Sequence, residues 1–106
     1  MNDFTIVIDP LGNLVHLTAD LYDLKGDELN IESFYDEVSR VIKKPAIIIK
    51  LKEKPVKLYY FKPIGWEFSL LLGVIMEEEI LVAFECHKNP TDKFMTELFA
   101  KGDQLL

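Results

Sequence analysis

Cysteine and long apolar runs are nearly absent from this chain of 106 residues. The single cysteine, Cys86, cannot form an internal disulfide, which excludes the small secreted domains that depend on such bonds. The longest apolar run covers residues 68–76, far short of the roughly 20 residues of a membrane-spanning helix. The first residues also lack the basic start and the small-residue cleavage site of a secretory signal. These absences predict a cytoplasmic protein without a membrane segment.

The short motifs of common catalytic and cofactor sites are missing as well. The sequence contains no GxGxxG, GxxxxGKS/T, GxSxG or HExxH pattern and no pair of cysteines. We therefore expect no cofactor and no metal site. Residues 77–79 are three adjacent glutamates, which would be very costly to bury, so we interpret them as an exposed turn.

Charge is unevenly distributed along the chain. The composition, 49% hydrophobic and 28% charged, is that of one globular domain covering residues 1–106. The net charge is −6, yet residues 40–62 carry eight bases and one acid. Residues 1–39 carry nine acids and one base, and residues 63–106 carry eight acids and three bases. This asymmetry can mark a polyanion-binding face on an acidic protein.

An apolar stretch in the second half of the chain predicts the centre of a sheet. The expected strand over residues 67–76 has Leu70 and Leu72 on one face and Leu71 on the other. A strand that is apolar on both faces is covered on both, so it belongs inside a sheet. Its expected neighbours cover residues 56–62 and 80–87. In the latter, alternation places Ile80, Val82, Phe84 and Cys86 on one face and Leu81, Ala83, Glu85 and His87 on the other.

Helical spacing identifies the elements that would cover this sheet. Apolar residues recur at the spacing of one helical stripe over residues 31–44, and Pro45 ends the pattern. Thr91 is the expected cap of a second helix over residues 92–101. The chain also predicts a hairpin around the turn at residues 9–13, a short helix after Thr18, and a strand over residues 46–52. The result is an α+β fold: an antiparallel four-stranded meander (about 46–87) with an amphipathic helix (about 31–44) packed on it, an N-terminal hairpin of unassigned position and a C-terminal helix.

Two histidines are available for acid–base chemistry, and His87 is the better candidate. Glu85 and His87 share a strand face because side chains alternate with a period of two. A carboxylate beside an imidazole is a workable acid–base pair, with His87 as acid or base and Glu85 orienting it. The same residues also fit the ordinary solvated end of a strand. His16, like His87, fits a half-exposed packing residue.

The basic block has two interpretations, a nucleic-acid-binding site or a sheet edge whose lysines prevent aggregation. Its candidate binding residues are Lys43, Lys44, Lys50, Lys52, Lys54 and Lys57. Tyr59, Tyr60, Phe61 and Trp66 are near the lysines in sequence, and lysines around exposed aromatics can hold a single-stranded nucleic acid by charge and stacking, with Lys50 and Lys52 holding phosphate. Alternatively, lysines on an edge hairpin prevent strand-to-strand aggregation without any ligand.

From Val15 onward the chain has, in order, Leu17-Thr18, a short helix, an amphipathic helix ending at Pro45, a strand containing Tyr59-Tyr60, an apolar strand with Val74, and the strand of residues 80–84. This order of features resembles that of small phage- and plasmid-associated proteins of the barnase–EndoU–colicin–RelE ribonuclease-like superfamily. The resemblance implies an RNA-related toxin or processing role, or a descendant that kept the fold and lost the chemistry. Proteins of that group commonly carry histidines shortly after the Leu-Thr pair, whereas residues 21–29 here contain none.

Two functions remain open at this point, and so does the question of whether the protein is an enzyme. One is a ribonuclease-like protein that binds RNA through the lysine-rich hairpin. The other is an acidic protein-interaction module, like an immunity protein or antitoxin, that binds a basic partner without catalysis. Its acidic surface would come from Asp20, Asp23, Asp27, Glu28, Glu32, Asp36 and Glu37. A homo-oligomer formed through a sheet edge is a further possibility.

Overall fold

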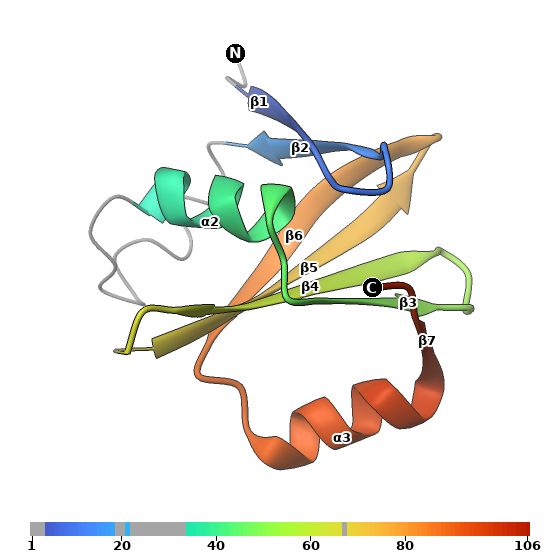
Figure 1. Cartoon of the computed structure of the whole chain (residues 1–106). Coiled ribbons are helices and arrows are strands. Elements are labelled where there is room, and N and C mark those ends of the chain that lie inside the picture. The colour runs from blue at the N-terminus through green and yellow to red at the C-terminus, as the bar shows by residue number, and fades with distance from the viewer. Residues whose placement is uncertain (1–3, 19–20, 22–33, 67) are drawn as a thin grey trace.

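The computed structural model describes residues 4–18, 21, 34–66 and 68–106 (Figure 1). In this part of the chain, one mixed sheet of seven strands carries a helix on each face. The elements are β1 (Phe4–Ile8), β2 (Leu14–Thr18), α2 (Phe34–Lys43), β3 (Ile47–Leu51), β4 (Lys57–Ile64), β5 (Phe68–Glu77), β6 (Ile80–Lys88), α3 (Asp92–Lys101) and β7 (Gly102–Gln104). The predicted α+β class is thereby confirmed.

The sheet is larger than the sequence predicted. Its strand order is β1-β2-β6-β5-β4-β3-β7, so the expected sheet of four strands is too small. The N-terminal hairpin joins it through a parallel pairing of β2 with β6, in which Val15 lies opposite Leu81. All other neighbouring strands are antiparallel. The short strand β7 pairs with β3, so β3 is not an edge strand of the sheet. The interpretation of its lysines as protection of a sheet edge requires an edge strand there.

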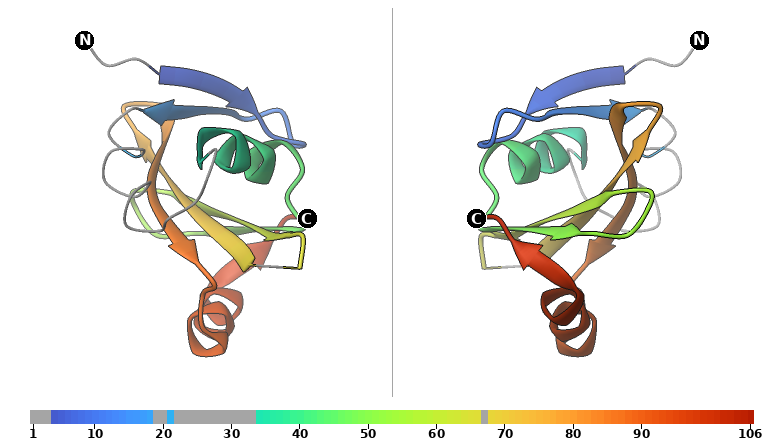
Figure 2. Two further views of the ribbon diagram at one scale, coloured as in Figure 1. Left: turned by 90° about the vertical axis from the view of Figure 1, so that its left-hand side faces the viewer. Right: turned by 90° about the vertical axis from the view of Figure 1, so that its right-hand side faces the viewer.

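Strand β5 lies in the middle of the sheet with both faces covered, as its sequence predicted. Leu70 and Leu72 belong to a core under α2, and Leu71 belongs to a second core under α3. We call the two sides of the sheet the α2 face and the α3 face. The curved sheet wraps around α2, whereas α3 covers only the end of the opposite face near β3 and β4 (Figures 1 and 2).

The two helices agree with their predicted positions within the described residues. Helix α2 begins at Phe34 in the structure, and residues 31–33 lie outside the described part of the chain. The side chain of Thr91 accepts a hydrogen bond from Phe94 N, so it caps α3 as expected. The short helix expected after Thr18 falls mainly on residues that are not described. Of that segment, Leu21 is described; it is buried and donates its backbone N–H to Thr18 Oγ1.

A β-bulge in β6 reverses the face on which Cys86 lies, so the face predicted for this residue is wrong. The register shifts between Gly73 and Val74, so that Ala83 and Glu85 lie opposite consecutive residues of β5. Phe84 is the extra residue, and the alternation of β6 restarts after it. Cys86 therefore lies in the core of the α2 face with Leu81, rather than on the face of Ile80 and Val82 that unbroken alternation predicted.

Candidate functional site

Strand β6 presents Glu85 and His87 together on the α3 face. Both residues follow the bulge, and both side chains are partly exposed. His87 Nε2 lies 3.3 Å from Glu85 Oε2, in a contact that becomes an ion pair only when the ring is protonated. The contact lacks hydrogen-bond geometry, and Nε2 is buried without a hydrogen-bond partner among the described residues.

A third residue, Tyr59, holds the carboxylate of Glu85 from across the sheet. Its hydroxyl donates a hydrogen bond of 2.6 Å to Glu85 Oε1. Tyr59 and Glu85 flank Gly73 in the register, and a Cβ at Gly73 would lie only 2.5 Å from Glu85 Cγ. The missing side chain of Gly73 is what lets the two residues meet above β5. Burial, reinforced by the bond to Glu85, raises the pKa of the Tyr59 hydroxyl well above its usual range, so it stays protonated.

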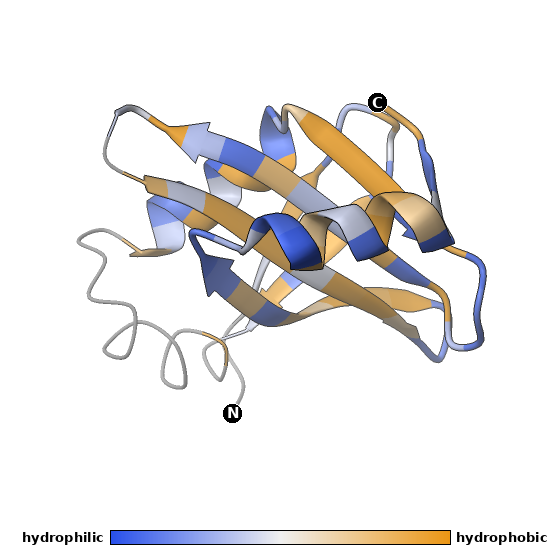
Figure 3. Cartoon of the chain, turned by 90° about the horizontal axis from the view of Figure 1, so that it is seen from below, coloured by the Kyte–Doolittle hydropathy of each residue, from blue (hydrophilic) through white to orange (hydrophobic). Residues whose placement is uncertain are grey.

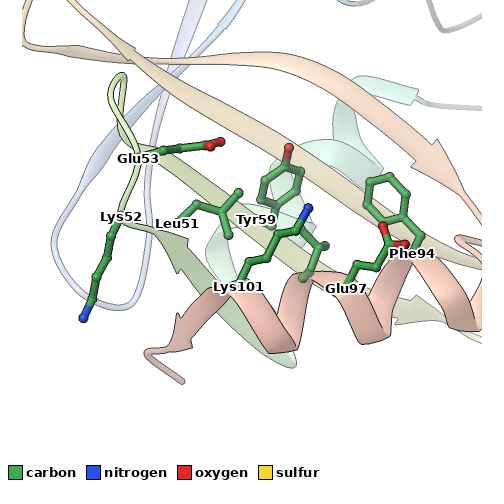
Figure 4. A pocket seen from close by; sticks show the side chains of 8 residues that line it. Leu51, Lys52, Glu53, Tyr59, Phe94, Glu97 and Lys101 are labelled. Carbon is green, nitrogen blue, oxygen red and sulfur yellow. The ribbon is translucent and has the colours of Figure 1, made fainter.

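A pocket of about 380 Å³ lies next to this group, between α3 and the adjoining ends of β3 and β4 (Figure 4). Phe94 connects the two features, since it lines the pocket and its ring centroid lies 5.0 Å from that of His87. The pocket combines an apolar floor with charges of both signs: Leu51, Lys52, Glu53, Tyr59, Phe94, Glu97, Leu98 and Lys101. The sequence identified Glu85 and His87 as a pair, but it did not identify Tyr59, because cross-strand neighbours depend on the register.

The candidate lysines do not gather at this pair. Lys50 lies opposite Leu58, whose side chain belongs to the core of the α2 face, so Lys50 and His87 are on opposite sides of the sheet. Lys52 and Lys57 are in ion pairs with Asp103 and Glu53, at 3.0 Å and 3.5 Å. Lys54 is in the turn between β3 and β4. Lys50 is therefore not in one phosphate site with His87, whereas Lys52 lines the pocket next to the Glu85–His87 pair.

The basic block instead separates into two groups along the β3–β4 hairpin. Lys50, Lys52, Lys54 and Lys57 lie toward its turn. At the other end, roughly 16 Å away by the rise of a five-residue strand, the chain surrounds a hollow of about 450 Å³. Its lining consists of Asp36, Ser39, Arg40, Lys43, Lys44 and Lys62, and we call it the basic hollow.

The basic hollow is built from the last turns of α2 and from β4. Lys62 Nζ donates a hydrogen bond of 2.8 Å to the backbone carbonyl of Lys44, which ties the two elements together. Two residues beyond the end of β4, Trp66 is fully exposed in the turn to β5. Arg40 and Lys62 belong to the basic block but are not among the binding residues that the sequence predicts. Their meeting depends on how α2 lies on the sheet.

The remaining polar candidates have structural roles. Asp9 is 4% exposed and accepts hydrogen bonds from the Tyr60 hydroxyl and from backbone and side-chain groups of its own turn. Burial alone would raise the pKa of Asp9, but the bonds from Tyr60, Asn13 and Leu11 outweigh it and hold the pKa below its usual value. His16 Nδ1 contacts the carbonyl of Leu81 at 3.1 Å. Within the described residues, no cluster of three His, Cys, Asp or Glu side chains could hold a metal ion.

Comparison with known proteins gave no match. No family model, curated protein or solved structure matches the chain. The ribonuclease-like resemblance therefore stays a prediction from the sequence. None of the helices in the described part of the chain is long and apolar enough to cross a membrane.

Proposed function

We propose that this protein binds single-stranded RNA through the basic hollow. The observation that carries the proposal is the convergence of Arg40, Lys43, Lys44 and Lys62 on one concave surface, where Asp36 is the only acid among the described lining residues. Clustered cations bind nucleic acid mainly by neutralising phosphates and releasing counterions. Lys52 and Lys57 at the other end of the hairpin have carboxylate partners, whereas in the hollow only Arg40 is paired, with Glu37 at 3.7 Å, among ion pairs of the described residues.

Trp66 supports a single strand as the ligand. Proteins that bind single strands combine a basic groove with aromatic rings on which the unpaired bases stack. Trp66 projects from the turn that follows β4, only four residues after Lys62, and its indole is fully exposed. A single strand held at Lys62 would have to extend up to about 13 Å, the rise of four extended residues, to place a base on this ring. The resemblance to ribonuclease-like proteins points to the same class of ligand.

RNA bound in the basic hollow is not expected to be cleaved by the Glu85–His87 pair. The basic hollow is formed by α2, whereas Glu85 and His87 are on the α3 face. A phosphodiester held in the hollow would therefore be on the wrong side of the sheet for His87. We expect a labelled oligonucleotide to remain intact after prolonged incubation with the protein, as seen on a denaturing gel.

The test uses Trp66, the only tryptophan of the chain, as a built-in probe. Titration with oligouridylate should quench its fluorescence, and log K should fall linearly with log salt concentration. The variant Lys43→Ala/Lys62→Ala should bind at least tenfold more weakly, with a salt slope about 1.4 smaller, because each phosphate contact to a single strand contributes roughly 0.7. Trp66→Ala should lose about tenfold in an assay with labelled RNA, since stacking is worth ~1–3 kcal/mol per base.

The matched control is Lys52→Ala/Lys54→Ala, which changes the net charge equally at the opposite end of the hairpin. It should leave the affinity within twofold of that of the unmodified protein. Equal losses in both double variants would show that overall charge, and not the basic hollow, governs binding, and the proposal would then fail.

A further inference from the structure

The α3 face is only half covered by its helix. Leu98 and Phe94 of α3 pack over β3 and β4, and the strands beyond them carry exposed apolar side chains. Figure 3 shows apolar stretches of the strands uncovered beside the helix. We call this surface the open face. It consists of five apolar residues whose side chains are 38% to 59% exposed: Ile6, Ile8, Leu14, Ile80 and Phe84.

The strand register shows that the open face is continuous. Ile8 lies opposite Leu14, and Ile6 lies opposite His16, which is in turn the partner of Val82. Val82 lies opposite Ile75 on β5, so this row from the outermost strand to the middle of the sheet is apolar except for His16. Exposed apolar patches that span several strands commonly mark sites where another protein binds.

The margin of the open face beside Ile80 is acidic, whereas Lys57, which is paired with Glu53, lies over the ring of Phe84 at 5.8 Å. Ile80 follows directly after Glu78 and Glu79 in the β5–β6 turn, and it lies opposite Glu77. All three glutamates are exposed, and none forms an ion pair with another described residue. The chain as a whole carries a net charge of −6. A second copy would bring a second set of these carboxylates, and like charges facing each other disfavour association.

We propose that the open face binds an amphipathic helix of a basic protein. Helix α3 shows that this side of the sheet accepts a helix through its apolar stripe, and a partner helix would continue the same layer over β6 and β2. Its lysines or arginines would face Glu77–Glu79, while its apolar stripe covers Ile8, Leu14 and Ile80. This recognition mode is that of a helix laid on an apolar surface, with charges selecting the partner. The site is on the opposite side of the sheet from the basic hollow.

The test uses a synthetic helical peptide of leucine and lysine with all leucines along one side, carrying a fluorescent label. A peptide of identical composition with the leucines scattered around the helix is the control ligand. The first peptide should raise the fluorescence anisotropy in a saturable way, and the second should bind at least tenfold more weakly. In NMR spectra, amide shifts should concentrate on β1, β2 and β6.

Two variants separate the apolar and the charged contributions. Ile8→Thr/Ile80→Thr keeps β-branched residues in the strands and should weaken binding at least tenfold, while Phe99→Ser, an exposed apolar residue on α3, should change it less than twofold. Glu78 and Glu79 both have positive φ angles, for which asparagine and glycine are better suited. Glu78→Asn/Glu79→Gly therefore removes two charges without disturbing the turn, and it should weaken binding severalfold at low salt.

The control for charge is Asp36→Asn/Glu97→Gln, which removes two exposed carboxylates away from the open face and should leave binding within twofold. Equal binding of both peptides, amide shifts elsewhere on the molecule, or unaltered affinity in the threonine variant would overturn the proposal. So would a dimer in light scattering that Ile8→Thr/Ile80→Thr converts to a monomer, because the occupant would then be a second copy. Failure of RNA binding would leave this result unaffected.

Discussion

At the scale of single residues, Gly73 decides whether Tyr59 and Glu85 can meet. The Tyr59 hydroxyl reaches Glu85 only over a position without a side chain, and an added Cβ would lie 2.5 Å from Glu85 Cγ. We expect Gly73→Ala to lower the free energy of unfolding by about 1–3 kcal/mol, the usual range for overpacking a buried site. Urea denaturation monitored by circular dichroism would measure this change.

A double-mutant cycle identifies the cause of that loss. In Glu85→Ala, the clashing atoms are absent, so Gly73→Ala should cost markedly less in this background than in the unmodified protein. The difference between the two costs is the coupling between positions 73 and 85. If Gly73→Ala were equally destabilising in both backgrounds, the close approach to Glu85 would not be its cause.

At the scale of elements, a buried side-chain hydrogen bond ties the N-terminal hairpin to β4. The Tyr60 hydroxyl on β4 donates a hydrogen bond of 2.6 Å to Asp9 Oδ2, which lies in the turn between β1 and β2. We expect Tyr60→Phe to lower the free energy of unfolding by about 1.5–3 kcal/mol at pH 7, because the acceptor is charged. Faster amide exchange in β1 and β2 should accompany this loss.

The pH dependence of this effect has a definite sign. The folded-state pKa of Asp9 lies below its ordinary value of 3.8, so ionised Asp9 stabilises the fold above that value. The contribution is lost as the pH falls through the folded-state pKa. The difference in unfolding free energy between the unmodified protein and Tyr60→Phe should therefore shrink under acidic conditions. A difference that stays constant from pH 7 to pH 3 would contradict this assignment.

Local periodicity accounts for what could be predicted at this scale. The alternation of β5, the stripe of α2 and the cap at Thr91 depend on residues close in sequence, and the structure has each element. Strand β7 has three residues, two of them polar, and leaves no periodic signal. The bulge at Phe84 and the meeting of Tyr59 with Glu85 depend on the pairing register, which sequence alternation alone does not specify.

At the scale of the whole molecule, two cores share one strand. Leu72 packs under α2 and Leu71 under α3, and both are fully buried. We expect Leu71→Ala and Leu72→Ala each to cost about 2–5 kcal/mol in unfolding free energy. Because β5 belongs to both cores, both variants should still unfold in one transition, with coincident curves from circular dichroism and from tyrosine absorbance.

The exposed Leu14 provides the control for these variants. Leu14→Ala removes the same atoms from a half-exposed site and should cost less than about 1 kcal/mol. Separate transitions in Leu71→Ala, with α3 lost before the sheet, would show that the two layers are independent units.

The parallel pairing of β2 with β6 has a consequence for the order of assembly. His16 and Leu81 are in contact although 65 positions separate them in sequence. A ribosome must therefore release most of the chain before the first hairpin can dock, and closing so long a loop slows the search for the native topology. Until then, the apolar side chains of β2 lack their partners on β6.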